Sequence, residues 1–176
     1  PVEVLNKETK QFEKRAQGSI LVGDIVKVNE GDIFPADLLF LRSGDPKAPK
    51  SCWVNTKSLD GETDNKYRQA LKCTSEKDGI PINGTAEELS ELQGIVNCEL
   101  PNNMTNDFNG TILLRTKTDS GIGDVSESIS IKNMLLRGCI LKNTKYVYGA
   151  VISTGVDTKV EYSNEKHHWW NVSNPN

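Results

Sequence analysis

Short runs of apolar and β-branched residues, separated at close intervals by Gly, Asn, Asp and Pro, recur along the whole chain. Runs of this length are too short for amphipathic helices and are typical of strands in antiparallel folds. We therefore predict one mainly β domain, a twisted antiparallel sandwich with one or two minor helices. The expected strands lie at residues 19–22, 24–28, 37–41, 51–55, 94–100, 111–115, 128–131, 135–142 and 146–154.

One internal segment has the pattern of a helix. Thr85 is a suitable N-cap, Glu88 follows three residues later as in a capping box, and Gly94 is a suitable end. Only Leu89 and Leu92 are apolar between these ends, so we expect a surface helix that covers little of the core.

Three further local features carry expectations. Residues 2–16 contain only a few apolar positions, and we predict a helical segment there. Residues 119–124 are predicted to form a loop. Gly149, inside the run at 146–154, indicates a β-bulge or a close approach of another chain segment.

Composition excludes several classes of protein. The 176 residues suffice for one domain with a core, and 21 basic against 24 acidic residues give no reason to expect nucleic acid as a partner. No apolar run approaches the roughly 18 residues of a membrane span. The sequence begins at Pro1 without a secretory signal, and we expect a soluble domain or a soluble piece of a larger protein.

The cysteines and histidines give no metal signature. Cys52, Cys73, Cys98 and Cys139 are widely spaced, and the only histidines, His167 and His168, are adjacent. Zinc sites usually need close ligand pairs, so we expect four unpaired thiols in a reducing compartment. No P-loop or GxSxG motif is present either, and no cofactor is expected in this chain.

The acidic segment Asp60-Gly61-Glu62-Thr63-Asp64 follows the expected strand at 51–55. It is not an EF-hand loop, because the sixth and twelfth positions hold Asn65 and Leu71 in place of Gly and Glu. On its own the tetrapeptide Asp60–Thr63 would be an acidic, solvated turn. Its neighbours along the chain change that interpretation.

Five blocks in fixed order resemble the actuator domain of the P-type ATPases, and the phospholipid-flippase branch most closely. The loop reads Asp-Gly-Glu-Thr where cation pumps generally have Thr-Gly-Glu, and the segment Leu135–Cys139 with Asn143-Thr144 is similar to a flippase run. The resemblance covers about residues 18–164. The blocks are Val22–Val26, Gly31–Asp37, Leu59–Thr63, Asn133–Cys139 and Thr154–Lys159.

The resemblance implies a distorted, jelly-roll-like sandwich and a role for the acidic loop. In this family an aspartate of a separate phosphorylation domain is phosphorylated, and the actuator loop enters that site for hydrolysis. The resemblance makes Glu62 the residue that orients and polarises the attacking water. Gly61 would permit a positive φ and close approach to the phosphate, Thr63 would donate a hydrogen bond, and Asp60 would order the loop or contact the partner domain.

The resemblance also implies the setting of the chain. The phosphorylation domain of the same polypeptide would be its partner, a phospholipid the substrate in the membrane part, and an accessory β-subunit a further partner. ATP and Mg²⁺ would bind elsewhere in the full-length protein, and the isolated chain would be inactive. The domain would lie on the cytosolic face of a membrane. One departure follows the motif, where flippases commonly have Asn-Leu-Lys and this chain has Asp64-Asn65-Lys66.

The resemblance divides the chain into three parts. Residues 1–17 would be a linker or helical segment from the membrane side, 18–164 the actuator domain, and 165–176 a tail. Trp169 and Trp170 in that tail fit either the approach to a membrane or an unstructured end. Two other functions stay open: a flippase-like regulatory module fused to another enzyme, and a β-sandwich module that binds glycans or proteins.

Overall fold

Strand β4 (Asp37–Ser43) lies at the centre of the fold, and all its residues are buried. A strand covered on both faces needs apolar side chains at successive positions, which explains the run Leu38-Leu39-Phe40-Leu41. The computed structural model describes residues 1–45, 47–77, 80–81, 84–118, 121–160 and 170–171.

The described strands form antiparallel sheets, which confirms the predicted mainly β fold. The largest has six strands in the order β12-β4-β14-β3-β1-β2. Its members are β1 (Val2–Asn6), β2 (Gln11–Arg15), β3 (Ile25–Asn29), β4, β12 (Met134–Leu135) and β14 (Tyr146–Ser153).

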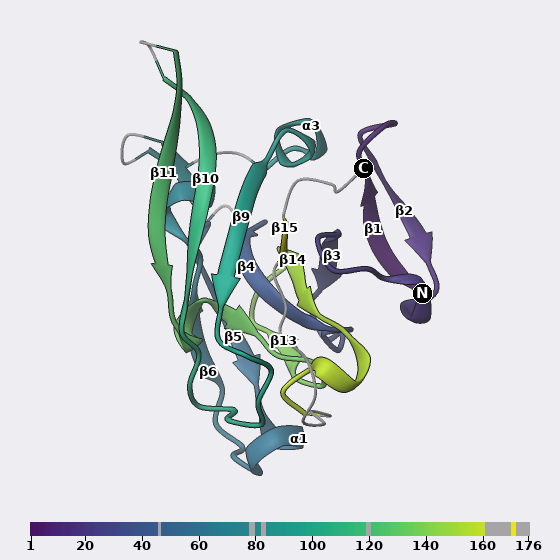
Figure 1. Cartoon of the computed structure of the whole chain (residues 1–176). Coiled ribbons are helices and arrows are strands. Elements are labelled where there is room, and N and C mark those ends of the chain that lie inside the picture. Colours follow the sequence, from purple (N-terminus) through teal and green to yellow (C-terminus); the bar gives the residue numbers. More distant parts are fainter. Residues whose placement is uncertain (46, 78–79, 82–83, 119–120, 161–169, 172–176) are drawn as a thin grey trace.

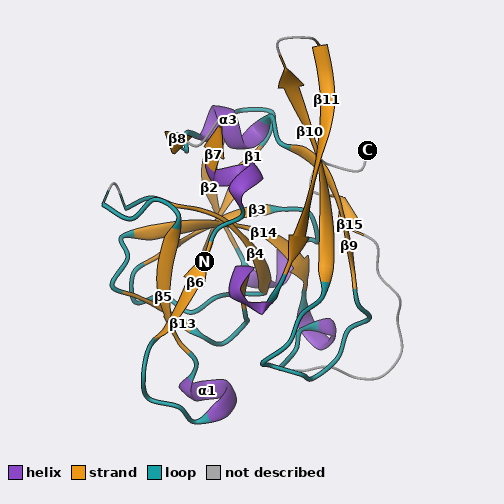
Figure 2. Cartoon of the chain, turned by 90° about the vertical axis from the view of Figure 1, so that its left-hand side faces the viewer, coloured by secondary structure: helices purple, strands orange, loops and turns teal. Residues whose placement is uncertain are grey.

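Smaller sheets pack around this one, and their buried side chains join a shared core (Figures 1 and 2). One has the order β11-β10-β9-β15 and consists of β9 (Gln93–Cys98), β10 (Gly110–Thr118), β11 (Gly121–Ile129) and β15 (Trp170–Asn171). Another has the order β13-β5-β6 and consists of β5 (Ser51–Asn55), β6 (Lys66–Gln69) and β13 (Ile140–Lys142). A short ladder joins β7 (Glu76–Lys77) and β8 (Ile80–Pro81).

The helices are all short. The predicted helix is present as α3 (Ala86–Ser90), and the side chain of Thr85 accepts a hydrogen bond from the backbone N–H of Glu88. It ends earlier than expected, because Gly94 belongs to β9 and pairs with Leu114. The other helical turns are α1 (Lys57–Asp60), α2 (Lys72–Ser75) and the 3₁₀ turns η1 (Gln17–Ser19), η2 (Ile131–Asn133) and η3 (Gly155–Asp157).

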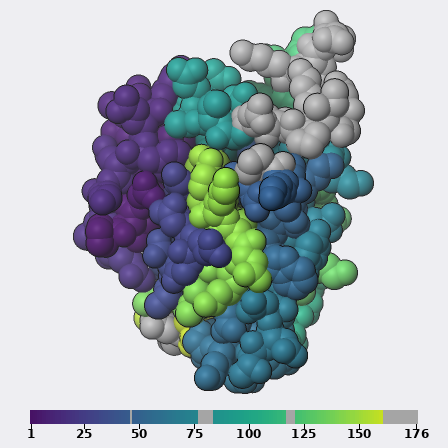
Figure 3. Space-filling model, turned by 180° about the vertical axis from the view of Figure 1, so that it is seen from behind, coloured from purple at the N-terminus to yellow at the C-terminus, as the bar shows by residue number. Residues whose placement is uncertain are grey.

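The predicted helix at residues 2–16 is wrong. The segment forms a β1–β2 hairpin that joins the large sheet through pairing of β1 with β3. The side chain of Asn6 accepts hydrogen bonds from the backbone N–H groups of Glu8 and Thr9 and so favours a turn. Phe12 stacks on Tyr148 with ring centroids 5.4 Å apart. Figure 3 shows this hairpin, in purple, beside the teal helix α3, with which both of its strands are in contact. The domain boundaries at 17–18 and 164–165 stay predictions.

Other boundaries also differ from expectation. The predicted strand at residues 19–22 is wrong: Ser19 ends η1, and the residues after it form a turn. The carboxylate of Asp24 stabilises this turn by accepting a hydrogen bond from the N–H of Leu21. The expected strand at 135–142 is divided by a turn into β12 and β13. The loop predicted at 119–124 is part of β11 from Gly121 onward, and residues 119–120 lie outside the described part.

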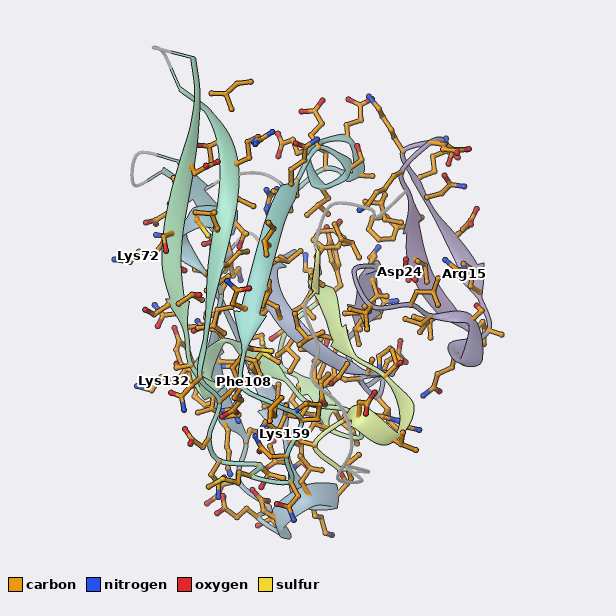
Figure 4. All side chains as sticks on the ribbon, viewed as in Figure 1. Arg15, Asp24, Lys72, Phe108, Lys132 and Lys159 are labelled. Atoms are coloured by element: carbon orange, nitrogen blue, oxygen red, sulfur yellow. The ribbon has the colours of Figure 1, made fainter. Side chains whose placement is uncertain are left out.

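The carboxylate of Asp37 is buried between segments that are distant in the sequence. It accepts hydrogen bonds from the backbone N–H of Arg137 at 2.9 Å, the backbone N–H of Lys159 at 2.7 Å and the hydroxyl of Ser153 at 3.1 Å. Burial raises the pKa of Asp37, and these donors act in the opposite direction. The ammonium group of Lys159 in turn binds Asn102 and lies 5.7 Å from the ring centroid of Phe108 (Figure 4). Asp37 thus connects β4 to β14, to the turn that precedes β13 and to the turn that follows β14.

Gly149 meets both expectations drawn from the sequence. The register of β14 against β4 shifts between Tyr148 and Gly149, and a Cβ at position 149 would lie 2.8 Å from the Cβ of Leu38. Gly149→Ala should therefore lower the free energy of unfolding by about 1–3 kcal/mol, because a buried backbone has to shift. Gly18→Ala is the matched control, since no atom lies within 4 Å of the added Cβ, and its effect should stay within about 0.5 kcal/mol. Equal urea-unfolding midpoints for the two variants would contradict the packing described.

Candidate functional site

The acidic loop lies at one end of the molecule, opposite the tip of the β10–β11 hairpin (Figures 1 and 2). Strand β5 leads into helix α1, and the chain returns through residues 61–65 to β6, which pairs with β5. The strand pair thus supports both ends of the loop.

Helix α1 is a single turn that ends at Gly61. The N–H of Gly61 donates to the carbonyl of Lys57 at 3.0 Å, and Gly61 has a φ of 75°. This is the left-handed conformation that glycine adopts at helix ends without steric cost. The positive φ expected for Gly61 is confirmed.

Asp60 connects the parts of the loop. Its carboxylate accepts hydrogen bonds from the hydroxyl of Thr56 at 3.1 Å, the backbone N–H of Glu62 at 3.0 Å and the ammonium group of Lys66 at 2.6 Å. Burial alone would raise the pKa of Asp60, but the hydrogen bonds from Lys66, Glu62 and Thr56 outweigh it and lower that pKa. Asp60 therefore fixes the shape of the turn, as one of the two roles predicted for it requires.

Glu62 extends from this fixed turn into solvent, with 59% of its side chain exposed. Its carboxylate forms an ion pair of 2.9 Å with Lys66, on the first residue of β6. The backbone beyond it is held by Asn55, whose amide group donates to the carbonyl of Thr63 at 3.3 Å. The site thus combines a hydrogen-bonded backbone with an exposed carboxylate.

A second contact joins the loop to the body of the protein. The hydroxyl of Ser58, on α1, donates to the carbonyl of Gly138 at 2.8 Å. Gly138 has a φ of 88° and lies beside Arg137, whose N–H is bound by Asp37. Ser58 directly precedes the block Leu59–Thr63, so its hydrogen bond brings that block next to Asn133–Cys139, and Asp37, of the block Gly31–Asp37, binds Asn133–Cys139 in turn.

Sequence reasoning placed all four expected residues, Asp60 to Thr63, in one loop, and it missed their support. Lys66 ends the segment that departs from the flippase pattern, at the one position that matches it, and it was not recognised as a partner of Glu62. A spacing of four residues between opposite charges could have suggested the pair. Ser58 and Asn55 act through backbone carbonyls, which no residue pattern identifies.

The thiols form no disulfide bonds. All four cysteines are free, as expected, and burial raises the pKa of Cys73, Cys98 and Cys139 to about 12. Within the described ranges, no three His, Cys, Asp or Glu side chains converge as metal ligands would. In that same part of the chain, every helix is too short or too polar to cross a bilayer.

Comparison with known proteins shows which sequences this chain is similar to. The chain is 37% identical over 150 residues to phospholipid-transporting ATPase IC of Xenopus tropicalis, a match that covers 85% of this chain and 11% of the relative. The chain is homologous to one segment of the phospholipid-transporting P-type ATPases. The resemblance to the flippase branch is thus confirmed, and the small β domain is consistent with an actuator domain.

Two further relatives agree. Phospholipid-transporting ATPase DNF1 of Saccharomyces cerevisiae is 37% identical over 150 residues, which cover 85% of this chain and 9% of the relative. Phospholipid-transporting ATPase ID of Homo sapiens is 39% identical over 142 residues, which cover 81% of this chain and 10% of the relative. No family model matches the chain. The chain spans about a tenth of the length of the relatives it matches.

The hydrogen bonds at Asp60 predict a pH dependence. A carboxyl group whose pKa is lower in the folded state stabilises the fold above its unfolded pKa of about 3.9, and this contribution is lost as the pH falls. Asp60→Asn should therefore unfold more easily than the wild-type chain near neutral pH. The difference in unfolding free energy should shrink as the pH is lowered to about 3. Urea unfolding at a series of pH values measures it, and a difference that grows on acidification would contradict the arrangement.

Proposed function

We propose that this chain is the cytosolic actuator domain of a flippase-like P-type ATPase, and that its Asp60–Thr63 loop promotes hydrolysis of an aspartyl phosphate. The observation that carries the proposal is the exposed Glu62 on a fixed turn, in a chain homologous to phospholipid-transporting ATPases. A loop that must enter another domain needs a reactive group outside the body of its own domain and a backbone that keeps its shape.

The proposed reaction is the attack of water on the phosphorus of the acyl phosphate. The water oxygen forms the new bond to phosphorus while the bond from phosphorus to the aspartate oxygen breaks, which releases inorganic phosphate and restores the aspartate. Glu62 accepts a proton from the attacking water and orients the lone pair of the water oxygen in line with the breaking bond. Because Gly61 has no side chain, the backbone of the turn can approach the phosphate closely.

The rest of the reaction is assigned to parts of the longer protein. The aspartate, ATP and Mg²⁺ belong in this proposal to the phosphorylation and nucleotide-binding domains of the same polypeptide. A phospholipid is moved by its membrane part, with an accessory β-subunit as a further partner. Rotation of the actuator domain as a rigid body, coupled to dephosphorylation, would transmit the chemical step to the lipid path. On this view the isolated chain hydrolyses no ATP.

Glu62→Gln in the full-length protein tests the proposal. The substitution keeps the size and hydrogen-bonding shape of the side chain but removes the base, so phosphoenzyme should form from ATP and then decay about 100-fold more slowly or worse. The measurement is the decay of labelled phosphoenzyme after a chase with unlabelled ATP.

Glu91→Gln, at an exposed position next to α3, is the matched control and should decay at the wild-type rate. Wild-type decay in Glu62→Gln would remove the assigned role. A full-length protein that forms no phosphoenzyme and shows no lipid-stimulated ATP hydrolysis would instead favour the regulatory module.

A further inference from the structure

Lys66 is placed between two carboxylates of the acidic loop. Its ammonium group lies 2.6 Å from Oδ2 of Asp60 and 2.9 Å from Oε2 of Glu62. The hydrogen bonds that this ammonium group donates to the two carboxylates raise the pKa of Lys66, so the side chain stays positively charged. The cation that contacts the exposed Glu62 therefore comes from the strand that follows the loop.

The two contacts of Lys66 differ in exposure. The side chains of Lys66 and Asp60 are 24% and 15% exposed, and Asp60 is itself fixed by Thr56 and by the N–H of Glu62. Glu62 is far more exposed, and such an ion pair is weak in water. Lys66 is thus anchored at Asp60, while Glu62 can leave and rejoin it at little cost.

The net charge of residues 60–66 gives the contact between Lys66 and Glu62 an electrostatic role. Between residues 60 and 66 the sequence carries Asp60, Glu62 and Asp64 and one cation, Lys66. A loop with this excess of negative charge would be repelled by an anionic phosphoryl group. A fixed ammonium group next to Glu62 reduces that repulsion and holds one oxygen of the carboxylate, while the other can accept a hydrogen bond from water.

We propose that Lys66 is a positioning residue for Glu62: anchored at Asp60, it orients the Glu62 carboxylate and offsets the charge of that carboxylate as the loop approaches an anionic phosphoryl group. This inference rests on the proposed function. It predicts that Lys66 influences hydrolysis through Glu62 and not through the stability of the fold.

A double-mutant cycle in the full-length protein tests it, with phosphoenzyme decay as the measurement. Lys66→Met should slow decay about tenfold or more, and Lys66→Arg should restore most of the rate because it keeps the charge. Lys66→Gln, which keeps a hydrogen-bond donor without charge, should resemble Lys66→Met. In a Glu62→Gln background, Lys66→Met should cause no further loss.

Lys72→Met is the matched control. Lys72 is exposed at the start of α2 and points away from the body of the protein, so its removal should leave decay unchanged (Figure 4). The amount of phosphoenzyme formed from ATP reports whether each variant is folded, and Lys66→Arg and Lys66→Gln provide the comparison if Lys66→Met is not.

Three outcomes would overturn the inference: normal decay in both Lys66→Met and Lys66→Gln, no rescue by Lys66→Arg, or losses that add to that of Glu62→Gln. Slow decay in Glu62→Gln together with normal decay in the Lys66 variants would leave the proposed function standing and reject this inference alone. Normal decay in Glu62→Gln would reject the proposed function itself.

Discussion

The buried carboxylate of Asp37 is the constraint on which the arrangement of this domain depends. Its donors come from Arg137, Ser153 and Lys159, which are 100, 116 and 122 residues away in the sequence. A charged carboxylate buried without such partners would be strongly unfavourable. Burial of a charged Asp37 therefore requires that these three segments lie together. Through the N–H of Arg137, Asp37 also fixes the turn that presents the carbonyl of Gly138 to Ser58 of α1, the helical turn that leads into the acidic loop.

The acidic loop therefore rests on a continuous set of contacts. The Asp37 carboxylate sets the turn at Gly138, that turn holds α1 through Ser58, and α1 ends at Gly61 in a left-handed conformation that only glycine adopts easily. Asp60 then closes the turn onto Lys66. Within this frame Glu62 is the exposed end of a rigid assembly, which suits a group that has to act on a phosphate held by another domain.

The elements that the sequence predicted well are those with a local cause. The run at 37–41 matches a strand buried on both faces, Gly149 marks the shift in β14, and Thr85 caps α3. The hairpin at 2–16 was predicted as a helix from a few sparse apolar positions. It is stabilised by Phe12 stacking on Tyr148, far along the chain.

For the site, the sequence predicted which residues form the loop and that Gly61 has a positive φ. It could not predict the role of Asp37, because its donors are backbone and hydroxyl groups more than 90 residues away. Nor could it predict that Lys66 joins Asp60 to Glu62, since this depends on how the turn folds back onto β6. Residues 161–169 and 172–176, including Trp169, lie outside the described part of the chain, while Trp170–Asn171 pairs with β9 as β15.

The most direct test of the central claim is the structure of the full-length protein with a planar phosphate analogue, such as aluminium fluoride, bound at the phosphorylated aspartate. The account predicts that a Glu62 carboxylate oxygen lies about 2.6–3.2 Å from the water positioned for in-line attack. A loop that remains outside the phosphorylation site in that complex, with a different residue bound to the water, would contradict it.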